Sequence, residues 1–252
     1  MHVLHLDAEP FHTLTYRNAL GGGRSGDMPL PFFHATVDAL PAGLDALVIC
    51  SDLQGRVGSR LLGVATVDAL VALGEQGALP PPAATGVLLA GDLYAAPKAD
   101  ERGASGDVTP VWDAFEERFR WVTGVLGNHD TLAAWHRARV LDGNILERDG
   151  LRIGGVSGII GKPTKPMRKA EAAFTAALRA VLDADVVVLH EGPEVPERRL
   201  LGHPAVRRTL DSASGAPLVI SGHCHWPTPF VVLPSTLQIL NVDGRVVVLR
   251  PA

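Results

Sequence analysis

The sequence predicts an α/β protein in which buried strands alternate with amphipathic helices. Short apolar runs rich in Val, Ile and Leu recur along the chain, which is the pattern of strands covered on both faces. Stretches with apolar residues at helical spacing lie between these runs. This alternation is typical of layered α/β architectures.

The individual elements follow from the same patterns. Five runs are predicted as buried strands: 45–50, 86–90, 121–126, 185–189 and 217–220. Four stretches are predicted as helices: 56–73, 110–120, 131–138 and 167–182. The pattern then changes, with a predicted hairpin at 145–156 that turns at Asp149-Gly150, and strands within 231–249 that turn at Pro234-Ser235 and Asp243-Gly244. A second, more antiparallel sheet is therefore expected.

The first 44 residues fit this alternation least well. The glycine-rich stretch 21–27 predicts a flexible loop, and Pro29, Pro31 and Pro41 interrupt the segment after it. An edge hairpin with a surface loop is favoured over a mobile flap that covers a site. No composition shift or long linker divides the chain, so 1–252 is predicted to be one domain with 1–44 as an N-terminal extension.

Composition restricts the partners of the protein. The 252 residues include 23 basic and 27 acidic side chains, so the net charge of −4 predicts that any anion is bound locally. Aromatic residues make up 5% of the chain, which disfavours a site that stacks several bases. Two cysteines are too few for a disulfide framework, and a cytoplasmic location is expected. The longest apolar stretch, 61–73, is shorter than the roughly 20 residues of a membrane span, so no membrane partner is expected.

Side chains able to bind metal follow almost every predicted buried strand. In open α/β sheets the carboxyl ends of the strands form the ligand-binding edge. Each residue alone has an ordinary explanation as a turn, a helix cap or a structural histidine, but five strand ends that all deliver such groups would be a rare coincidence. The residues are Asp52, Gln54, Asp92, Asn128, His129, Asp130, His190, His223 and His225.

Together with their neighbours, these residues form short motifs whose order along the chain resembles that of the calcineurin-like metallophosphoesterase superfamily. The family pattern is Asp-x-His, Gly-Asp, Gly-Asn-His-Asp or Gly-Asn-His-Glu, a strand-end His, and Gly-His-x-His. Four of these five blocks match unchanged, at Gly91-Asp92, 127–130, His190 and 222–225. The resemblance implies a four-layer α/β/β/α sandwich with two mixed sheets.

The resemblance also implies a binuclear metal centre bridged by Asp92. One metal would be held by Asp92 together with Asp52, residue 54 and His225, and the other by Asp92 together with Asn128, His190 and His223. Oxygen and imidazole ligands suit Mn, which is favoured, and also Fe, Zn or Mg. Two cations would activate a hydroxide and neutralise phosphate oxygens during the hydrolysis of a phosphodiester or phosphomonoester.

His129 is the candidate acid that protonates the leaving group, because its neighbour Asn128 is the implied ligand while its own imidazole has no assigned metal. Asp130 has two interpretations that can hold together. It could fix the tautomer of His129 and raise its pKa, or cap the predicted helix 131–138.

Gln54 stands where the family usually has His. A carboxamide oxygen is a weaker and harder ligand than an imidazole. The first metal site is therefore expected to bind its ion loosely and to prefer Mn or Mg to Zn.

A basic segment, 161–169, contains Lys162, Lys165 and Arg168 and no acidic residue. It is either a solvated loop or a clamp for a second phosphate at the start of the predicted helix from Met167.

The substrate expected from these patterns is a small nucleotide or diester. Gly91-Asp92 lacks the Gly-Asp-x-x-Asp-Arg-Gly extension of the Ser/Thr protein phosphatases, which disfavours their substrates. A nuclease or nucleic-acid end-processing phosphodiesterase stays open, as does a non-catalytic interaction scaffold with this fold. The sequence predicts no particular oligomeric state.

Overall fold

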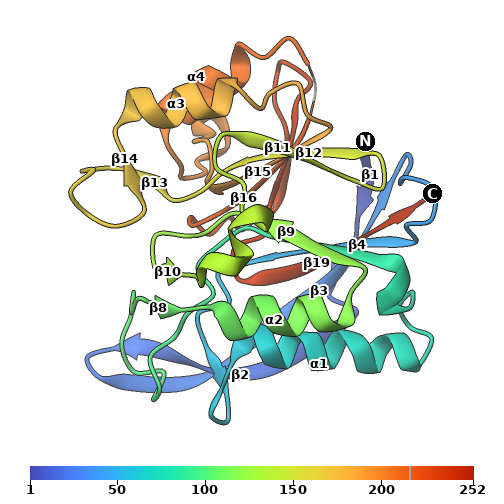
Figure 1. The fold of residues 1–252 in the computed structure, drawn as a ribbon, viewed down its shortest axis with the longest axis vertical. Coiled ribbons are helices and arrows are strands. Elements are labelled where there is room, and N and C mark those ends of the chain that lie inside the picture. Colours follow the sequence, from blue (N-terminus) through green and yellow to red (C-terminus); the bar gives the residue numbers. More distant parts are fainter. Residues whose placement is uncertain (216) are drawn as a thin grey trace.

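The computed structural model describes residues 1–215 and 217–252, without the side chain of Arg137, and shows a mixed α/β fold built on two larger sheets (Figure 1). The first sheet has nine strands in the order β6-β5-β2-β3-β19-β4-β7-β9, and β1 also pairs with β3. Its strands are β1 (Val3–Leu6), β2 (His12–Gly21), β3 (Arg24–Val37), β4 (Ala46–Ser51), β5 (Arg56–Val57), β6 (Arg60–Leu61), β7 (Thr85–Leu89), β9 (Trp121–Gly124) and β19 (Arg245–Pro251).

The second sheet has six strands in the order β11-β12-β15-β16-β18-β17. Its inner pairs are parallel and its two outer pairs are antiparallel. The strands are β11 (Asn144–Arg148), β12 (Leu151–Val156), β15 (Val186–Glu191), β16 (Leu218–Gly222), β17 (Phe230–Val232) and β18 (Gln238–Asn241). Two small parallel pairs join β8 (Gly106–Asp107) to β10 (Asp130–Thr131), and β13 (Ile159–Ile160) to β14 (Arg168–Lys169).

The helices complete the described elements. They are α1 (Leu62–Glu75), α2 (Thr109–Arg118), α3 (Glu171–Arg179) and α4 (Pro204–Asp211), with 3-10 helices η1 (Pro82–Ala84), η2 (Ala134–Arg139) and η3 (Pro196–Arg198). Helices α1 and α2 lie along the first sheet, and α3 and α4 lie along the second (Figure 1). None of the helices in the described part of the chain is long and apolar enough to cross a membrane.

Three hydrophobic clusters hold these elements together. Because successive residues of a strand face opposite sides of its sheet, Val48 packs with α1 and α2 while Ile49 packs in a cluster formed by both sheets. In the second sheet Val188 packs in that shared cluster, and Val187 packs with α3 and α4. The strands of both sheets are therefore apolar on two faces, as their sequences indicate.

The five predicted buried strands are confirmed, as β4, β7, β9, β15 and β16, with ends shifted by one or two residues. The predicted hairpin at 145–156 is confirmed as β11 and β12, and its turn lies at Asp149-Gly150. The predicted helix 110–120 corresponds to α2. The prediction of an α/β protein with a second sheet is therefore correct. The expectation that this second sheet is the more antiparallel one is wrong, because its inner pairs are parallel while most pairs of the first sheet are antiparallel.

Three predicted helices need correction. Residues 56–61 form the short pair β5 and β6 with Gly58 in the left-handed region, so α1 begins only at Leu62. Residues 131–138 contain a strand residue and the 3-10 helix η2 instead of an α-helix. The segment from Met167 is not helical until Glu171, because Met167 has a φ of 51° and the next two residues form β14.

The last strand is also placed differently from the prediction. The sequence predicts that residues 231–249 complete one antiparallel sheet, and β17 and β18 do pair in this way. After the turn at Asp243-Gly244, however, β19 enters the first sheet between β3 and β4. Val246 and Val247 pack in different clusters, so both faces of β19 are apolar. A position in the middle of the first sheet buries both faces.

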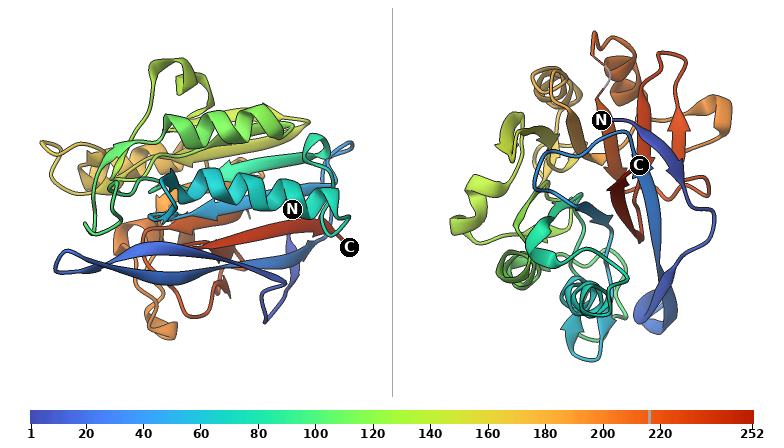
Figure 2. Two further views of the ribbon diagram at one scale, coloured as in Figure 1. Left: turned by 90° about the horizontal axis from the view of Figure 1, so that it is seen from below. Right: turned by 90° about the vertical axis from the view of Figure 1, so that its right-hand side faces the viewer.

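The N-terminal segment forms the favoured hairpin, but most of the stretch 21–27, which was predicted as a flexible loop, belongs to its strands β2 and β3. Only the turn at 22–23 separates β2 from β3, and the long hairpin extends beyond the other strands at the end opposite the chain termini (Figure 2). Pro29 and Pro31 lie within β3, where β2 is the partner on one side only, because β19 pairs with β3 from Phe32 onward. A proline without a donor is tolerated at such an edge. Beyond Phe32, β3 is an internal strand and not part of an edge hairpin.

Candidate metal centre

The predicted ligands lie where strands of the two sheets end near one another. Asp52 follows β4 directly, and Asp92 follows β7 by three residues. From the second sheet, His190 lies near the end of β15, and His223 follows β16. Strands β4 and β7 are parallel, as are β15 and β16, so each sheet brings its pair of side chains to one edge.

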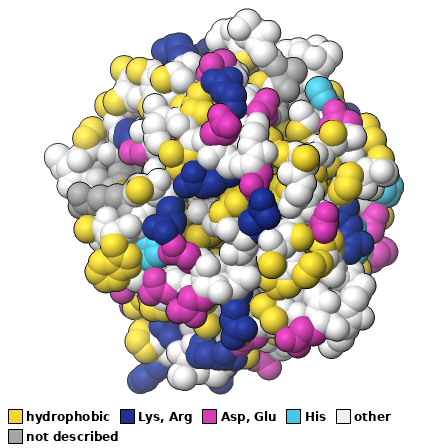
Figure 3. Space-filling view, turned by 45° about the vertical axis from the view of Figure 1, so that its right-hand side comes forward, with side chains coloured by type: hydrophobic (Ala, Val, Ile, Leu, Met, Phe, Trp, Pro, Cys, Tyr) yellow, Lys and Arg dark blue, Asp and Glu magenta, His cyan; other side chains and the backbone are white. Residues whose placement is uncertain are grey.

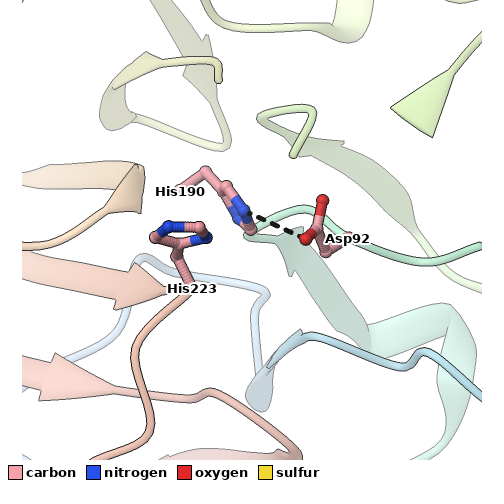
Figure 4. A group of neighbouring side chains, drawn as sticks. All are labelled: Asp92, His190 and His223. Carbon is pink, nitrogen blue, oxygen red and sulfur yellow. Dashed lines mark ion pairs between the residues drawn. The ribbon is translucent and has the colours of Figure 1, made fainter. Parts of the chain in front are cut away.

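Asp92, His190 and His223 form a cluster in which one donor atom of each residue lies within 4.8 Å of the others (Figure 4). His190 Nε2 is 3.4 Å from Asp92 Oδ2, and the two imidazole rings are 5.0 Å apart between centroids. His190 and Asp92 are buried, and His223 is half-buried. The sequence predicted that these side chains meet at one sheet edge, whereas the structure brings them together from two sheets.

The tautomer of His190 suits metal binding. Its Nδ1 donates a hydrogen bond of 2.8 Å to the carbonyl oxygen of Ala90, which leaves Nε2 directed at the cluster. Burial lowers the pKa of His190, but the Asp92 carboxylate outweighs this effect and the pKa is raised to about 10. Burial and the neighbouring positive charge of His190 lower the pKa of His223 to about 4. Without a metal, the cluster therefore holds one proton on His190.

Two buried atoms here have no hydrogen-bond partner among the described residues, Asn128 Oδ1 and His190 Nε2. Both belong to the ligand set that the sequence implies for the second metal. A buried polar atom without a partner costs free energy unless a water or an ion satisfies it. A carboxylate, a carboxamide oxygen and two imidazoles also form a donor set that divalent transition metals accept, so the residues fit a cation.

The backbone is strained at three predicted ligands. Asp52, Asp92 and His223 have φ values of 55°, 54° and 66°, in the left-handed region that disfavours side chains with a Cβ. They are three of the eight described non-glycine residues with positive φ. Such strain persists only where the surroundings enforce it, and it collects at functional sites.

The close packing of two loops explains why residue 127, before Asn128, is a glycine. A Cβ at Gly127 would lie 2.0 Å from Asp92 Oδ1 and 2.3 Å from the Asp92 backbone nitrogen. A Cβ at Gly91 would lie 2.4 Å from the Gly127 nitrogen. The two loops that carry Asp92 and Asn128 can therefore approach each other only without side chains at these positions.

Asp130 holds these loops in place. Its buried carboxylate accepts hydrogen bonds from the backbone N–H groups of Asp92 (2.7 Å), Leu93 (2.8 Å) and Gly127 (2.9 Å). Burial and the nearby Asp92 raise the pKa of Asp130 to about 6. Neither predicted role is observed, because no α-helix follows for it to cap and its hydrogen bonds go to this backbone.

His129 has a different partner from the one predicted. Its Nδ1 lies 3.0 Å from the Ser105 hydroxyl oxygen, and its backbone N–H donates to Asp92 Oδ1. Ser105 lies in the loop before β8, with no strand-end or motif signal, so sequence reasoning could not find it. The half-buried imidazole stays beside the cluster without belonging to it.

The remaining predicted ligands line a cavity beside the cluster but are not gathered into it. Asp52 Oδ2 accepts hydrogen bonds from Ser51 Oγ and from the His223 backbone N–H. Gln54 Nε2 donates to Asp92 Oδ2 over 3.1 Å, so the amide group and not the carbonyl oxygen faces the cluster. The His225 side chain is 65% exposed.

Asp243 is a site residue that the sequence analysis missed. Its Oδ2 lies 3.5 Å from His225 Nδ1, and it lines the same cavity as Asp52. Burial and the Asp243 carboxylate raise the pKa of Asp52 well above its usual value. The sequence pattern indicated only a turn at Asp243, but this residue follows β18, which runs parallel to β16, so the strand-end pattern could have identified it.

The basic segment is a loop between β13 and β14 and does not lead directly into a helix. Lys162 and Lys165 are exposed, whereas Arg168 is half-buried. Burial is the main cause of the low pKa of His223, and the charge of Arg168 makes a minor contribution. The predicted clamp at a helix start from Met167 is wrong in its geometry, because α3 begins only at Glu171.

No protein-family model and no curated protein matches the chain. The fold is similar to the crystal structure of TT1561 of Thermus thermophilus, with a TM-score of 0.55 and 15% sequence identity, over 80% of this chain and 90% of that chain. A hypothetical protein from Thermus thermophilus gives a TM-score of 0.45 and 20% identity, over 79% of this chain and 76% of that chain. The similarity to TT1561 shows a shared mixed α/β fold and nothing finer.

Proposed function

We propose that this protein is a metal-dependent phosphoesterase of the calcineurin-like metallophosphoesterase type. One observation carries the proposal. Asp92, His190 and His223 converge from two sheets in one cluster, which includes a buried nitrogen of His190 that makes no hydrogen bond within the described part of the chain and lies with the likewise unpartnered Asn128 Oδ1 in the implied ligand set. This donor set at the carboxyl ends of parallel strands is suited to a divalent cation.

The fold supports the same proposal. The architecture expected of this superfamily is a four-layer α/β/β/α sandwich with two mixed sheets. Three separate hydrophobic clusters, one between the sheets and one on the helix side of each, are what such a sandwich requires.

The ligand assignments follow the chain. Asp92, Asn128, His190 and His223 would hold one cation, and Asp92, Asp52, Gln54 and His225 the other, with Mn favoured for both. When bound, the two cations would activate water and neutralise the charge of a phosphate ester.

Other residues of the chain supply positioning and proton transfer. His129 would donate a proton to the leaving alcohol from its ring, whose Nδ1 is oriented by Ser105. Asp130 holds the Asp92 and Gly127 loops at the distance that the cluster needs. Arg168, whose charge makes a minor contribution to the low pKa of His223, would add positive charge for a phosphate group.

The test is hydrolysis of bis(p-nitrophenyl) phosphate by the Mn-loaded protein. Asp92→Ala should abolish turnover. His129→Ala should lower kcat by about 10²- to 10⁴-fold for an alkyl phosphate ester, whose alkoxide leaving group needs a proton, and much less for p-nitrophenolate, which leaves without one. His2→Ala is the matched control, because His2 is an exposed histidine paired with Asp38 and far from the predicted motifs in sequence. A folded protein without turnover in Mn, Fe(II), Zn or Mg would refute the enzyme and favour the non-catalytic scaffold.

A small organic phosphate is favoured over a nucleic acid as substrate. Binding along a nucleic-acid backbone depends on a continuous basic track. The chain has 23 basic and 27 acidic side chains, and on the face shown in Figure 3 the two signs are interspersed. Single-stranded oligonucleotides in the same assay test this alternative directly.

A further inference from the structure

A cavity of about 970 Å³ opens beside the candidate metal centre. Asp52, Gln54 and His223 line one part of it, so the cavity is continuous with the place where a phosphate group would bind. The volume is far larger than a phosphate needs and is in the range of small-molecule sites. The remaining lining therefore bears on the rest of the substrate.

Much of the remaining wall is apolar, and we call it the apolar wall. It is formed by β1, β3 and the first residue of β17. Its residues are Leu4, Met28, Pro29, Pro31, Phe33 and Phe230. The side chains of Leu4 and Met28 are large, yet these residues are 60% and 40% exposed. Apolar surface open to water in a concave site is free to bind an apolar ligand.

The alternation along β3 shows that this apolarity is not explained by the core. Leu30 and Phe32 are fully buried in the cluster shared with α1 and α2. Pro29, Pro31 and Phe33 alternate with them, on the opposite face of the strand, and border the cavity. A strand face that only meets water usually carries polar residues.

The cavity offers few free cations for a second phosphate. The buried guanidinium of Arg245 is engaged, since its NH2 donates to the Trp226 carbonyl oxygen at 2.9 Å. Arg102 is the other arginine in the lining, which also contains the carboxylates of Asp7 and Asp243. A doubly phosphorylated substrate would therefore be poorly balanced in this cavity.

We propose that the apolar wall binds the organic group of the phosphate ester, and that this group is an apolar one such as an aryl ring. The inference rests on the proposed function in one respect, because the metal centre is what would hold the phosphate end. It assigns Leu4, Met28 and Phe33 as residues that determine substrate specificity.

The test compares the binding of two non-hydrolysable probes, phenylphosphonate and methylphosphonate, to the Mn-loaded protein by titration calorimetry. Burying the phenyl ring should make phenylphosphonate bind about 10- to 100-fold more tightly. The Leu4→Ser/Met28→Ser variant, altered at exposed positions that add little to the core, should lose most of this preference and bind methylphosphonate as before. Phe33→Ser should act in the same direction. Leu201→Ser is the matched control, because Leu201 is 71% exposed and lies outside the cavity.

The results separate this inference from the proposed function. A phenyl preference that the cavity variants abolish supports the apolar wall even if no ester is hydrolysed. Hydrolysis of diesters without any phenyl preference overturns the apolar wall and leaves the phosphoesterase standing. A preference that persists in the cavity variants, or no binding of phenylphosphonate by the folded, loaded protein, also overturns the inference.

Discussion

The two halves of the candidate metal centre differ in how well their ligand side chains are oriented before a metal binds. The closed half consists of Asp92, Asn128, His190 and His223, and three of these residues already direct donor atoms at one point. The open half consists of Asp52, Gln54 and His225. Here one oxygen of Asp52 is engaged by Ser51, Gln54 presents its amide nitrogen, and His225 extends into solvent.

This difference has a thermodynamic consequence. In the closed half the unpartnered Asn128 Oδ1 gains a partner when a cation binds, and the imidazoles of His190 and His223 already lie at the cluster. In the open half the Gln54 amide must turn and the exposed His225 side chain must be ordered, which costs conformational entropy. The closed half is therefore expected to bind its metal first and more tightly.

The largest expected effect comes from removing a ligand of the closed half. His190→Ala should weaken the tighter metal site on the order of 100-fold or more, because it removes a pre-oriented imidazole. Asp52→Asn, which alters the open half, should leave one tightly held metal. Metal content after Mn loading and gel filtration measures both. Equal losses in the two variants would show that the halves are not distinct.

The next effect comes from restoring an imidazole in the open half. Gln54→His should raise the affinity of the weaker site about 10- to 100-fold, since imidazole is a stronger ligand for Mn and Zn than a carboxamide. The wild-type protein should retain fewer than two metals through mild chelation, and the variant should retain more. Two stoichiometric, chelation-resistant metals in the wild-type protein would contradict the idea of a labile open half.

The closed half should also bind metal more tightly as pH rises. The pKa of His190 is raised to about 10 in the metal-free protein, so below that pH a cation must displace its proton. His223, with a pKa of about 4, is already neutral at pH 7. One displaced proton predicts an affinity that rises about tenfold between pH 7 and pH 8. Calorimetry in buffers of different ionisation enthalpy should record release of about one proton, and a pH-independent affinity would refute this assignment.

The sequence predicted the closed half better than the open half, for a physical reason. Asp92, His190 and His223 are attached to or directly follow buried strands, whose apolar runs are easily identified and whose ends share an edge. The open half depends on side-chain rotamers and on Asp243, whose contact with His225 arises from β18 and a turn. No local pattern reports such contacts between distant segments.

The fold shows the same division between local and distant determinants. The apolar runs of β4, β7, β15 and β16 were identified because both their faces are buried. In β3, Pro29 and Pro31 were interpreted as breakers, since sequence alone does not show that this part of the strand has a neighbour on one side only. Similarly, Met167 adopts a left-handed conformation that its local helical pattern could not predict.

The smallest expected effect concerns the basic loop beside the two halves. Arg168→Ala should raise KM for bis(p-nitrophenyl) phosphate about two- to fivefold, because Arg168 is half-buried and its charge reaches His223 in the closed half. Lys162→Ala is the matched control, since Lys162 is exposed and the charge of a solvated side chain is screened by salt. Steady-state kinetics at low and moderate ionic strength measure the difference. If both variants raise KM equally, the loop attracts the substrate only through its total positive charge, and the specific position of Arg168 contributes nothing to binding the phosphate.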